Sequence, residues 1–551
     1  MNKLDTPIGI SNRFTVFGII GIMIIGLAIR LFYFPHDLPL SLDALSYFAY
    51  GFEISQTGQF PIGVELVNNG WPMLLSMFFS AFKFDNFLSY MEVERIASVI
   101  ISLVTVIPVY FLCRKFFTKF ISLIGAAIFL IEPRIISNSV LGITEPLYVL
   151  LGTSAIVLFL SGKKWIYLSF GVLAIFSIVR YEGLLLFVPF SIMYFIRFKK
   201  ENKKIIKFVL CAGIFFLILF PMAMIRMDTM GKDGFISHYS HGLKIIDRYV
   251  IQGSHEHCYD DDGNAIEDCM SNLTKISSDG NIEIADSYPG EVNTNRIGPF
   301  ISTGLSTLMI NFGLIQIPIF IFFIPLGIVF ILRDRKWKKL NHKHGILLLC
   351  FIFCLVPILY AHGRLILEFR YYFILYPLII LICLYGLDRL QPKLINKKII
   401  LIPLIFGILI LSIGFLEFNK TDLSLERESF SITSQVVSMS NVVNGDSLHG
   451  NYITTANMIN EWPNLKKPSD VKINKISPWG YQDIEEFLTK SKEKGLDHIV
   501  VDDMNNGPEY IQEIFTNEEK YLFLEKVFDS KKVGYNYHVK IFRINYEILE
   551  G

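Results

Sequence analysis

Charged residues at the ends of long apolar runs are the strongest candidates for chemistry in this sequence. Asp43 follows the first apolar run, and Glu145 opens a later one. A carboxylate at such a place can take a proton from a substrate, or it can cap a helix. Arg180, Arg364 and Arg370 lie at the ends of further apolar runs, where a guanidinium can bind a phosphate with two hydrogen bonds. The sequence therefore predicts that acids and cations gather where apolar elements end.

Each of these residues also has a purely structural interpretation. Asp43 can cap the helix that it begins, with Ser41 as a competitor for that cap. Glu145 stands before Pro146, and a carboxylate there suits the start of a helix electrostatically. The arginines can extend to the membrane interface or pair with nearby carboxylates. The candidate pairs are Arg180 with Glu182 and Arg364 with Glu368.

The composition indicates that membrane helices must position these side chains. Of the 551 residues, 52% are hydrophobic, and the apolar residues fall into blocks about as long as a bilayer is thick. The mean hydropathy is +0.46. The formal charge of +1 gives no indication of a nucleic-acid partner, and we expect none. The sequence therefore predicts a polytopic protein of the lipid bilayer.

We expect about eleven transmembrane helices over residues 1–417, followed by a soluble domain over residues 418–551. The first helix is expected over residues 14–34, retained rather than cleaved as a signal peptide. In the soluble domain, strands are expected over residues 498–501 and 537–544 and a helix over residues 481–494. That pattern predicts a small α/β or α+β domain. The remaining spans are expected near residues 94–113, 120–131, 145–161, 166–179, 183–196, 205–225, 314–332, 345–361, 371–387 and 399–416.

Patches of lysine and arginine between these spans predict which side of the membrane each loop faces. Positively charged loops stay inside, so the C-terminal domain and the loops without such patches are predicted to be extracytoplasmic. This places Asp43, Arg180 and Arg370 on one face of the membrane. The predicted outer segments are residues 35–93, 132–144, 180–182, 226 to about 311, and 362–370.

The long outer segment carries further candidates. Cys258 and Cys269 can form a disulfide, or they can be two free thiols in a loop. Asn272 and Asn419 each begin a glycosylation sequon. A cluster of histidines and aspartates can bind a divalent cation, although its spacing matches no metal motif, so we assign no metal ligand. The clustered residues are His238, His241, His255, His257, Asp260, Asp261 and Asp262.

Several of these features together resemble a known family. The sequence resembles the GT-C glycosyltransferases, and among them the protein O-mannosyltransferases and aminoarabinose transferases, which use polyprenyl-phosphate sugars. The resemblance covers roughly residues 13–389. It rests on Asp43 with Tyr47, the Gly58 to Pro61 turn, Pro72, the Thr144-Glu145-Pro146-Leu147-Tyr148 segment and the Arg180-Tyr181-Glu182-Gly183 corner.

The resemblance implies a fold and a reaction. It implies an inverting transfer of a sugar from a polyprenyl-phosphate donor to a protein, lipid or glycan acceptor, on the extracytoplasmic side of the cell membrane. Asp43 would be the base, and Arg180, Arg364 and Arg370 would bind the donor phosphate. Substrate-positioning roles fall to Tyr47, Glu145 and Tyr371.

The sequence departs from the family at one position. Many relatives have a second acidic residue directly after the first, whereas this chain has Ala44, which argues against a site built from two adjacent carboxylates. No cofactor is assigned, although a divalent cation is compatible with the family. The Trp-Trp-Asp-Tyr-Gly signature of oligosaccharyltransferases is also missing, which argues against transfer to asparagine.

A transporter or flippase of lipid-linked sugars is the main alternative function, for which inverted repeats and broken helices would be typical. A membrane scaffold without catalytic activity is a further alternative.

Overall fold

A computed structural model describes most of the helical part of the chain and much of the C-terminal part. Statements about structure below refer to the described residues. These are residues 11–36, 38–40, 42–64, 66, 68–84, 87–237, 275–276, 282–283, 297–333, 342–363, 366–390, 397–420, 423–425, 427–429, 431–432, 451–454, 474–475, 481–493, 496–503 and 508–550.

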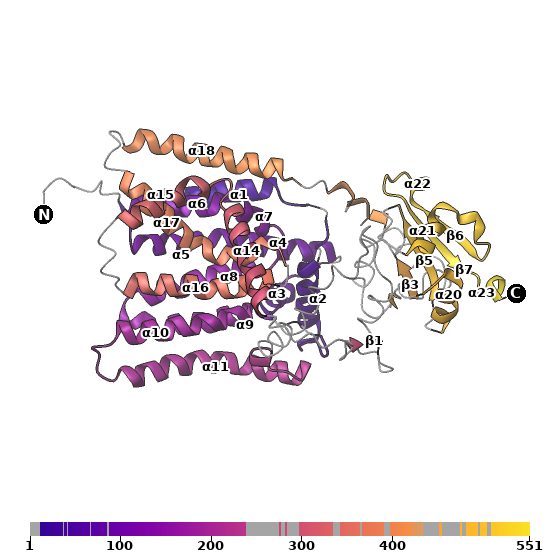
Figure 1. The fold of residues 1–551 in the computed structure, drawn as a ribbon, viewed down its shortest axis with the longest axis horizontal. Coiled ribbons are helices and arrows are strands. Elements are labelled where there is room, and N and C mark those ends of the chain that lie inside the picture. Colours follow the sequence, from indigo (N-terminus) through magenta and orange to yellow (C-terminus); the bar gives the residue numbers. More distant parts are fainter. Residues whose placement is uncertain are drawn as a thin grey trace.

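Long apolar helices form a bundle in which most of them run side by side (Figure 1). Apolar runs of this length become helices because a helix pairs its own backbone N–H and C=O groups. Inside a bilayer there is no water to form those hydrogen bonds instead. The bundle contains α1 (Asn12–Phe32), α4 (Phe87–Val104), α5 (Val106–Arg114), α6 (Lys119–Ile131), α8 (Glu145–Leu160), α9 (Ile166–Val179), α10 (Phe187–Arg197), α11 (Lys204–Met230), α14 (Ile297–Leu314), α15 (Phe320–Arg333), α16 (His342–Gly363), α17 (Tyr376–Leu390) and α18 (Lys397–Phe418).

Several of these helices are long and apolar enough to cross a bilayer. Among the described residues there are five, or six if the bent pair α6 and α7 (Pro133–Ser139) counts as one span. The five are Asn12–Phe32, Leu88–Arg114, Lys204–Met230, Lys343–Gly363 and Phe369–Arg389. Shorter apolar helices include Glu145–Leu160, Phe300–Leu314, Phe320–Arg333 and Phe406–Phe418. The protein is therefore a multi-pass membrane protein, and the count of about eleven spans stays a prediction.

One expectation about the loops is wrong. Residues 226 to about 311 were expected to form an outer loop, but α14 fills the end of that segment and packs against α16. The first half of α14 contains Gly298, Pro299, Ser302, Thr303 and Gly304, which lower its hydropathy below that of the neighbouring spans. Packing against α16 stabilises a helix that the apolar pattern alone does not indicate.

Two short helices lie at one end of the bundle. These are α2 (Leu42–Thr57) and α3 (Gly70–Ala81), which pack closely against each other (Figure 1). Their contact is filled by the buried rings of Phe48 and Phe79, whose centroids are 5.4 Å apart. Most of the apolar run that follows Pro72 lies within α3. Asp43 therefore stands in the first turn of a helix that is packed onto the bundle.

Further contacts within the bundle form near the break between α6 and α7, where the two helices meet at an angle of 54°. Glu132 caps α7 by accepting a hydrogen bond from the backbone N–H of Ile135 at 2.8 Å. Arg134 donates to the backbone carbonyls of Leu314, at 3.1 Å, and of Ile317. It thereby joins α7 to the turn between α14 and α15.

The C-terminal part contains a five-stranded mixed sheet in the order β4-β3-β5-β7-β6. Strand β3 is parallel to β4 and β5, and β7 is antiparallel to β5 and β6. Its described elements are β3 (Asn451–Thr454), β4 (Asn474–Lys475), α20 (Ile484–Lys492), β5 (Leu496–Asp502), α21 (Glu509–Thr516), η8 (Glu518–Lys520), β6 (Leu524–Asp529), α22 (Ser530–Val533), β7 (Val539–Ile544) and α23 (Tyr546–Glu550). The expected helix and both expected strands are confirmed. The boundary at residue 418 stays a prediction.

Candidate active site

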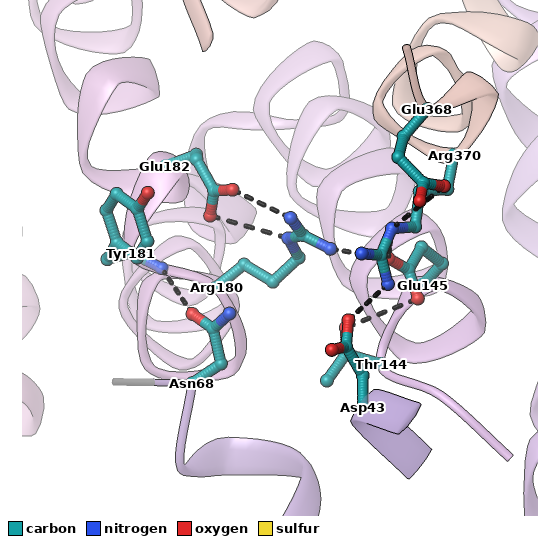
Figure 2. A network of polar contacts seen from close by, with 9 residues as sticks. All are labelled: Asp43, Asn68, Thr144, Glu145, Arg180, Tyr181, Glu182, Glu368 and Arg370. Carbon is teal, nitrogen blue, oxygen red and sulfur yellow. Dashed lines mark hydrogen bonds and ion pairs between the residues drawn. The ribbon is translucent and has the colours of Figure 1, made fainter. Parts of the chain in front are cut away.

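Three charged side chains form the buried part of a polar cluster (Figure 2). Arg180 follows α9 and precedes the 3-10 helix η2 (Tyr181–Leu186), and Glu145 is the first residue of α8. Nη1 of Arg180 lies 2.5 Å from Oε1 of Glu145, and Nη2 lies 2.8 Å from Oε1 of Glu182. A third hydrogen bond joins Nε of Arg180 to Oε2 of Glu182 at 3.4 Å. Arg180 is thus held by two carboxylates from different elements.

A second guanidinium lies beside the first. Arg370 belongs to the 3-10 helix η5 (Phe369–Leu375), which precedes α17, and it donates a hydrogen bond to Oδ2 of Asp43. Its Nε lies 3.6 Å from Oε2 of Glu368 and 4.0 Å from Oε1 of Glu145. Glu145 therefore links the two arginines, as Figure 2 shows.

Exposure divides the cluster into an inner and an outer part. The side chains of Glu145 and Arg180 are 2% and 9% exposed, whereas Arg370 is 24% and Asp43 is 48% exposed. A buried guanidinium that already has two carboxylate partners has little capacity for another anion. An ion pair that is partly exposed can open to a ligand at lower cost. Asp43 and Arg370 are therefore the members of the cluster that a ligand can reach.

Aromatic rings surround the two guanidiniums. The guanidinium carbon of Arg180 lies 5.5 Å from the ring centroids of both Tyr148 and Tyr371, and that of Arg370 lies 6.0 Å from the centroid of Tyr371. Tyr148 in turn stacks on Phe176 with centroids 4.2 Å apart. Such contacts fix the orientation of the planar guanidinium groups.

Burial and charge set the protonation states at this site. Burial by itself lowers the pKa of Arg180, but the carboxylates of Glu182 and Glu145 outweigh it and raise that pKa well above its ordinary value. Burial raises the pKa of Tyr47 to about 12, so its hydroxyl stays protonated at neutral pH. Tyr47 can therefore donate a hydrogen bond here, and the half-exposed carboxylate of Asp43 is the better candidate for a base.

The structure brings together most of the residues that the sequence singled out. Asp43, Glu145, Arg180 and Arg370 contact one another as described above, and Tyr371 lies over both guanidiniums. Tyr47 is close enough for the charges of Arg180, Glu145 and Asp43 to affect its pKa. Asn419 lies apart from them, directly after α18. Arg364, Cys258, Cys269, Asn272 and the histidine cluster lie outside the described residues.

Sequence reasoning missed the polar contacts that surround this cluster. Asn68 accepts a hydrogen bond from the backbone N–H of Tyr181 at 3.4 Å, next to Arg180. Trp71 donates to the buried carboxylate of Glu94 at 3.1 Å. Of the Asn69-Gly70-Trp71-Pro72 segment, the sequence-based resemblance uses only Pro72. Its buried amide and indole groups need partners, and that need is the signal that could have found these contacts.

Among the described residues there is no group of three or more His, Cys, Asp or Glu side chains that could hold a metal ion. Asp43 and Glu368, the two most exposed carboxylates of the cluster, both face the guanidinium of Arg370, and Ala44 offers no carboxylate beside Asp43.

No protein-family model matches the sequence, and no curated protein sequence matches it. Solved structures do match the fold. The oligosaccharyltransferase of Archaeoglobus fulgidus in complex with zinc and sulfate is 13% identical, with a TM-score of 0.55, over 88% of this chain and 68% of that chain. The same archaeal enzyme, AglB, in complex with an inhibitory peptide and a dolichol-phosphate is 10% identical, with a TM-score of 0.51, over 89% and 69%.

A bacterial enzyme matches over the full length. ArnT from Cupriavidus metallidurans bound to undecaprenyl phosphate is 9% identical, with a TM-score of 0.54, over 97% of this chain and 98% of that chain. AglB and ArnT are membrane glycosyltransferases of the GT-C superfamily. The chain therefore has the GT-C fold, which confirms the expected resemblance at the level of the fold.

Proposed function

We propose that this protein is a membrane glycosyltransferase that transfers a sugar from a polyprenyl-phosphate donor to an acceptor on the extracytoplasmic side. The observation that carries the proposal is the contact between Asp43 and Arg370 at the reachable edge of the cluster. A carboxylate base beside a phosphate-binding cation is what such a transfer needs. Fold similarity to enzymes that were solved with dolichol-phosphate and undecaprenyl phosphate supports the choice of donor.

The reaction follows from the roles of these two residues. Asp43 takes the proton of an acceptor hydroxyl, whose oxygen forms a new bond to the anomeric carbon of the sugar. The bond between that carbon and the phosphate oxygen breaks, and polyprenyl phosphate leaves with the electron pair. Arg370 stabilises the charge that develops on the departing phosphate. A single displacement of this kind inverts the anomeric carbon.

The charges of the cluster link donor binding to the release of the proposed base. Asp43, Glu145, Glu182 and Glu368 outnumber the guanidiniums of Arg180 and Arg370. A phosphate must therefore displace a carboxylate from Arg370 in order to bind. Asp43 is the displaced partner in our proposal, and its release makes it available as a base when the donor is present.

Other residues have supporting roles in the proposal. Tyr47, Glu145 and Tyr371 position the substrates and the two guanidiniums, and Arg180 contributes its charge from within the cluster. Arg364 is proposed as a further phosphate ligand on sequence grounds. The acceptor is a protein, lipid or glycan hydroxyl, and the C-terminal domain is proposed to lie on the same side and to contribute to acceptor choice.

A transfer assay tests the function directly. The purified full-length protein is incubated in nanodiscs with radiolabelled undecaprenyl-phosphate or dolichyl-phosphate sugars and with membrane extracts as acceptors. We expect label to move from the lipid to an acceptor, and Asp43→Asn to lower the rate of that movement about a hundredfold or more. Transfer at the unmodified rate in Asp43→Asn would remove Asp43 as the base. Absence of transfer with every donor would contradict the proposed reaction.

A flippase of lipid-linked sugars remains the second candidate, because the break between α6 and α7 is a feature of transporters. The same preparation separates the two functions. A flippase moves a fluorescent polyprenyl-phosphate sugar between leaflets without transferring the sugar, whereas the proposed enzyme consumes it. Translocation without transfer would favour the flippase.

A further inference from the structure

We infer that the segment Asn68 to Trp71, which leads into α3 and includes its first two residues, positions the groups of the proposed reaction by contacting the chain next to each of them. The inference rests on the proposed function and deepens it, because it assigns a role to residues that do not touch the substrate. Each contact below joins this segment, directly or through α4, to a part of the chain that carries a residue of the cluster.

The first contacts fix the chain around Arg180. Gly70 packs so closely that an added Cβ would lie 2.7 Å from Cα of Val179, the residue before Arg180. On the other side of Arg180, the backbone N–H of Tyr181 donates to Oδ1 of Asn68 at 3.4 Å. Two residues of the segment, Asn68 and Gly70, therefore contact the chain on the two sides of Arg180.

The next contact fixes the chain before Glu145. The indole Nε1 of Trp71, which is fully buried, donates to the backbone carbonyl of Gly142 and to Oε1 of Glu94, both at 3.1 Å. Gly142 lies three residues before Glu145 and has a φ of +84°, which glycine adopts without strain. An added Cβ there would lie 3.2 Å from Cγ of Glu94. Trp71 and Glu94 thus fix the turn that leads to α8.

The last contacts reach the chain before Asp43. Arg95, adjacent to Glu94 on α4, donates to the backbone carbonyls of Leu38 and, at 2.7 Å, of Pro39. A guanidinium that spans two consecutive carbonyls fixes both the position and the direction of a chain. Glu94 and Arg95 are both buried, so that these bonds form away from competing water. The chain before Asp43 is therefore held to the same anchor as the chain before Glu145.

The segment accordingly acts as a common support for Asp43, Glu145 and Arg180, which approach it from α2, α8 and the end of α9. Displacing it would change the distances among the three at once. Loss of catalytic geometry by about 1 Å can cost about a hundredfold in rate. Glu94, Arg95 and Trp71 are positioning residues in this proposal.

Hydrogen exchange on the full-length protein in nanodiscs tests the inference without any substrate. Trp71→Phe keeps the ring and removes the N–H donor. We expect amide exchange to rise about tenfold both over residues 38–46 and over residues 140–148. Ser76→Ala, on the same helix, removes only a local hydrogen bond to the carbonyl of Met73 and should leave both regions unchanged. Glu94→Gln keeps an oxygen that can accept from Trp71, and it should preserve the slow exchange that Glu94→Ala loses.

Kinetics then relate this support to the reaction. With a radiolabelled undecaprenyl-phosphate sugar, Trp71→Phe should lower kcat about tenfold or more while KM for the donor stays within about twofold. Ser76→Ala, which leaves the contacts of Trp71 intact, should change neither kcat nor KM. Exchange that rises equally throughout the bundle, or that leaves residues 140–148 unchanged, would overturn the inference. Absence of transfer by the unmodified protein would instead count against the proposed function, and the exchange result would still decide the inference.

Discussion

Arg370 donates a hydrogen bond to Asp43, although 327 residues separate them in the sequence. Glu145 approaches the same guanidinium from α8 while it also pairs with Arg180. The proposed base and the proposed phosphate ligand therefore neutralise each other in the structure. A phosphate that binds to Arg370 must separate them, which implies that the lipid donor binds before the acceptor.

Asp43→Asn should lower transfer about a hundredfold or more, because the amide cannot take the proton of the acceptor. The same variant should bind undecaprenyl phosphate more tightly, because the phosphate no longer has to break the ion pair between Arg370 and Asp43. Transfer and binding are measured on one nanodisc preparation. Asp228→Asn, an exposed aspartate near the end of α11, serves as the control and should change neither quantity. Unaltered transfer in Asp43→Asn would disprove its role.

Arg370→Lys should weaken the binding of undecaprenyl phosphate about tenfold, because an ammonium group cannot form two parallel hydrogen bonds with a phosphate. The apparent KM for the donor should rise accordingly. Arg427→Lys, at an exposed position after α18, provides the matched change outside the cluster. Equal affinities for the wild type and Arg370→Lys would show that this residue is not the phosphate ligand.

Glu145→Gln should lower the free energy of unfolding by about 3 kcal/mol, because it removes a buried charge that pairs with Arg180. Glu417→Gln removes a half-exposed carboxylate and should cost less than about 1 kcal/mol. Thermal unfolding in detergent compares the two variants. If both shift the midpoint equally, Glu145 does not hold the cluster together.

Acid should loosen the C-terminal sheet. Burial lowers the pKa of His498, on β5, to about 4 from an ordinary value of 6.5. The folded sheet therefore favours the neutral ring, so its full stability is present above pH 6.5 and is lost as the pH falls from 6.5 towards 4. The loss amounts to about 3 kcal/mol. Amide exchange of β5 and β7 in the full-length protein should rise over this pH range, and His498→Gln should flatten the rise. An unchanged pH dependence in that variant would assign the effect to other groups.

Cysteine labelling tests the predicted sidedness. In a Cys258→Ser and Cys269→Ser background, a membrane-impermeant maleimide added to intact cells should modify Gln59→Cys but not Lys339→Cys. Residue 59 lies in the predicted first outer loop, and residue 339 in a predicted inner patch of positive charge. Permeabilised cells should show modification of both variants. The opposite labelling pattern would invert the proposed orientation.

The sequence predicts local features of this fold better than long-range ones. The apolar runs predict α1 and α11, and the charged residues Glu145 and Arg180, which the sequence places at the ends of other apolar runs, do lie in the cluster. The pairing of Arg180 with Glu182 was considered from the sequence because the two residues are close in the chain. The contact between Asp43 and Arg370 could not be predicted in this way, because it depends on how elements that are far apart in the sequence pack together. The role of Trp71 was missed for the same reason, since its partners Glu94 and Gly142 become neighbours only after folding.

Arg134 resists the separation of α7 from the turn between α14 and α15. Its guanidinium holds the carbonyls of Leu314 and Ile317, and its own helix continues from α6 through a bend. A force that pulled α7 away from the turn between α14 and α15 would have to break these bonds first. Alternating access requires parts of a transporter to move against one another in every cycle, whereas transfer at a fixed site requires no such movement. Contacts that hold α7 to the turn between α14 and α15 therefore suit an enzyme with a fixed site.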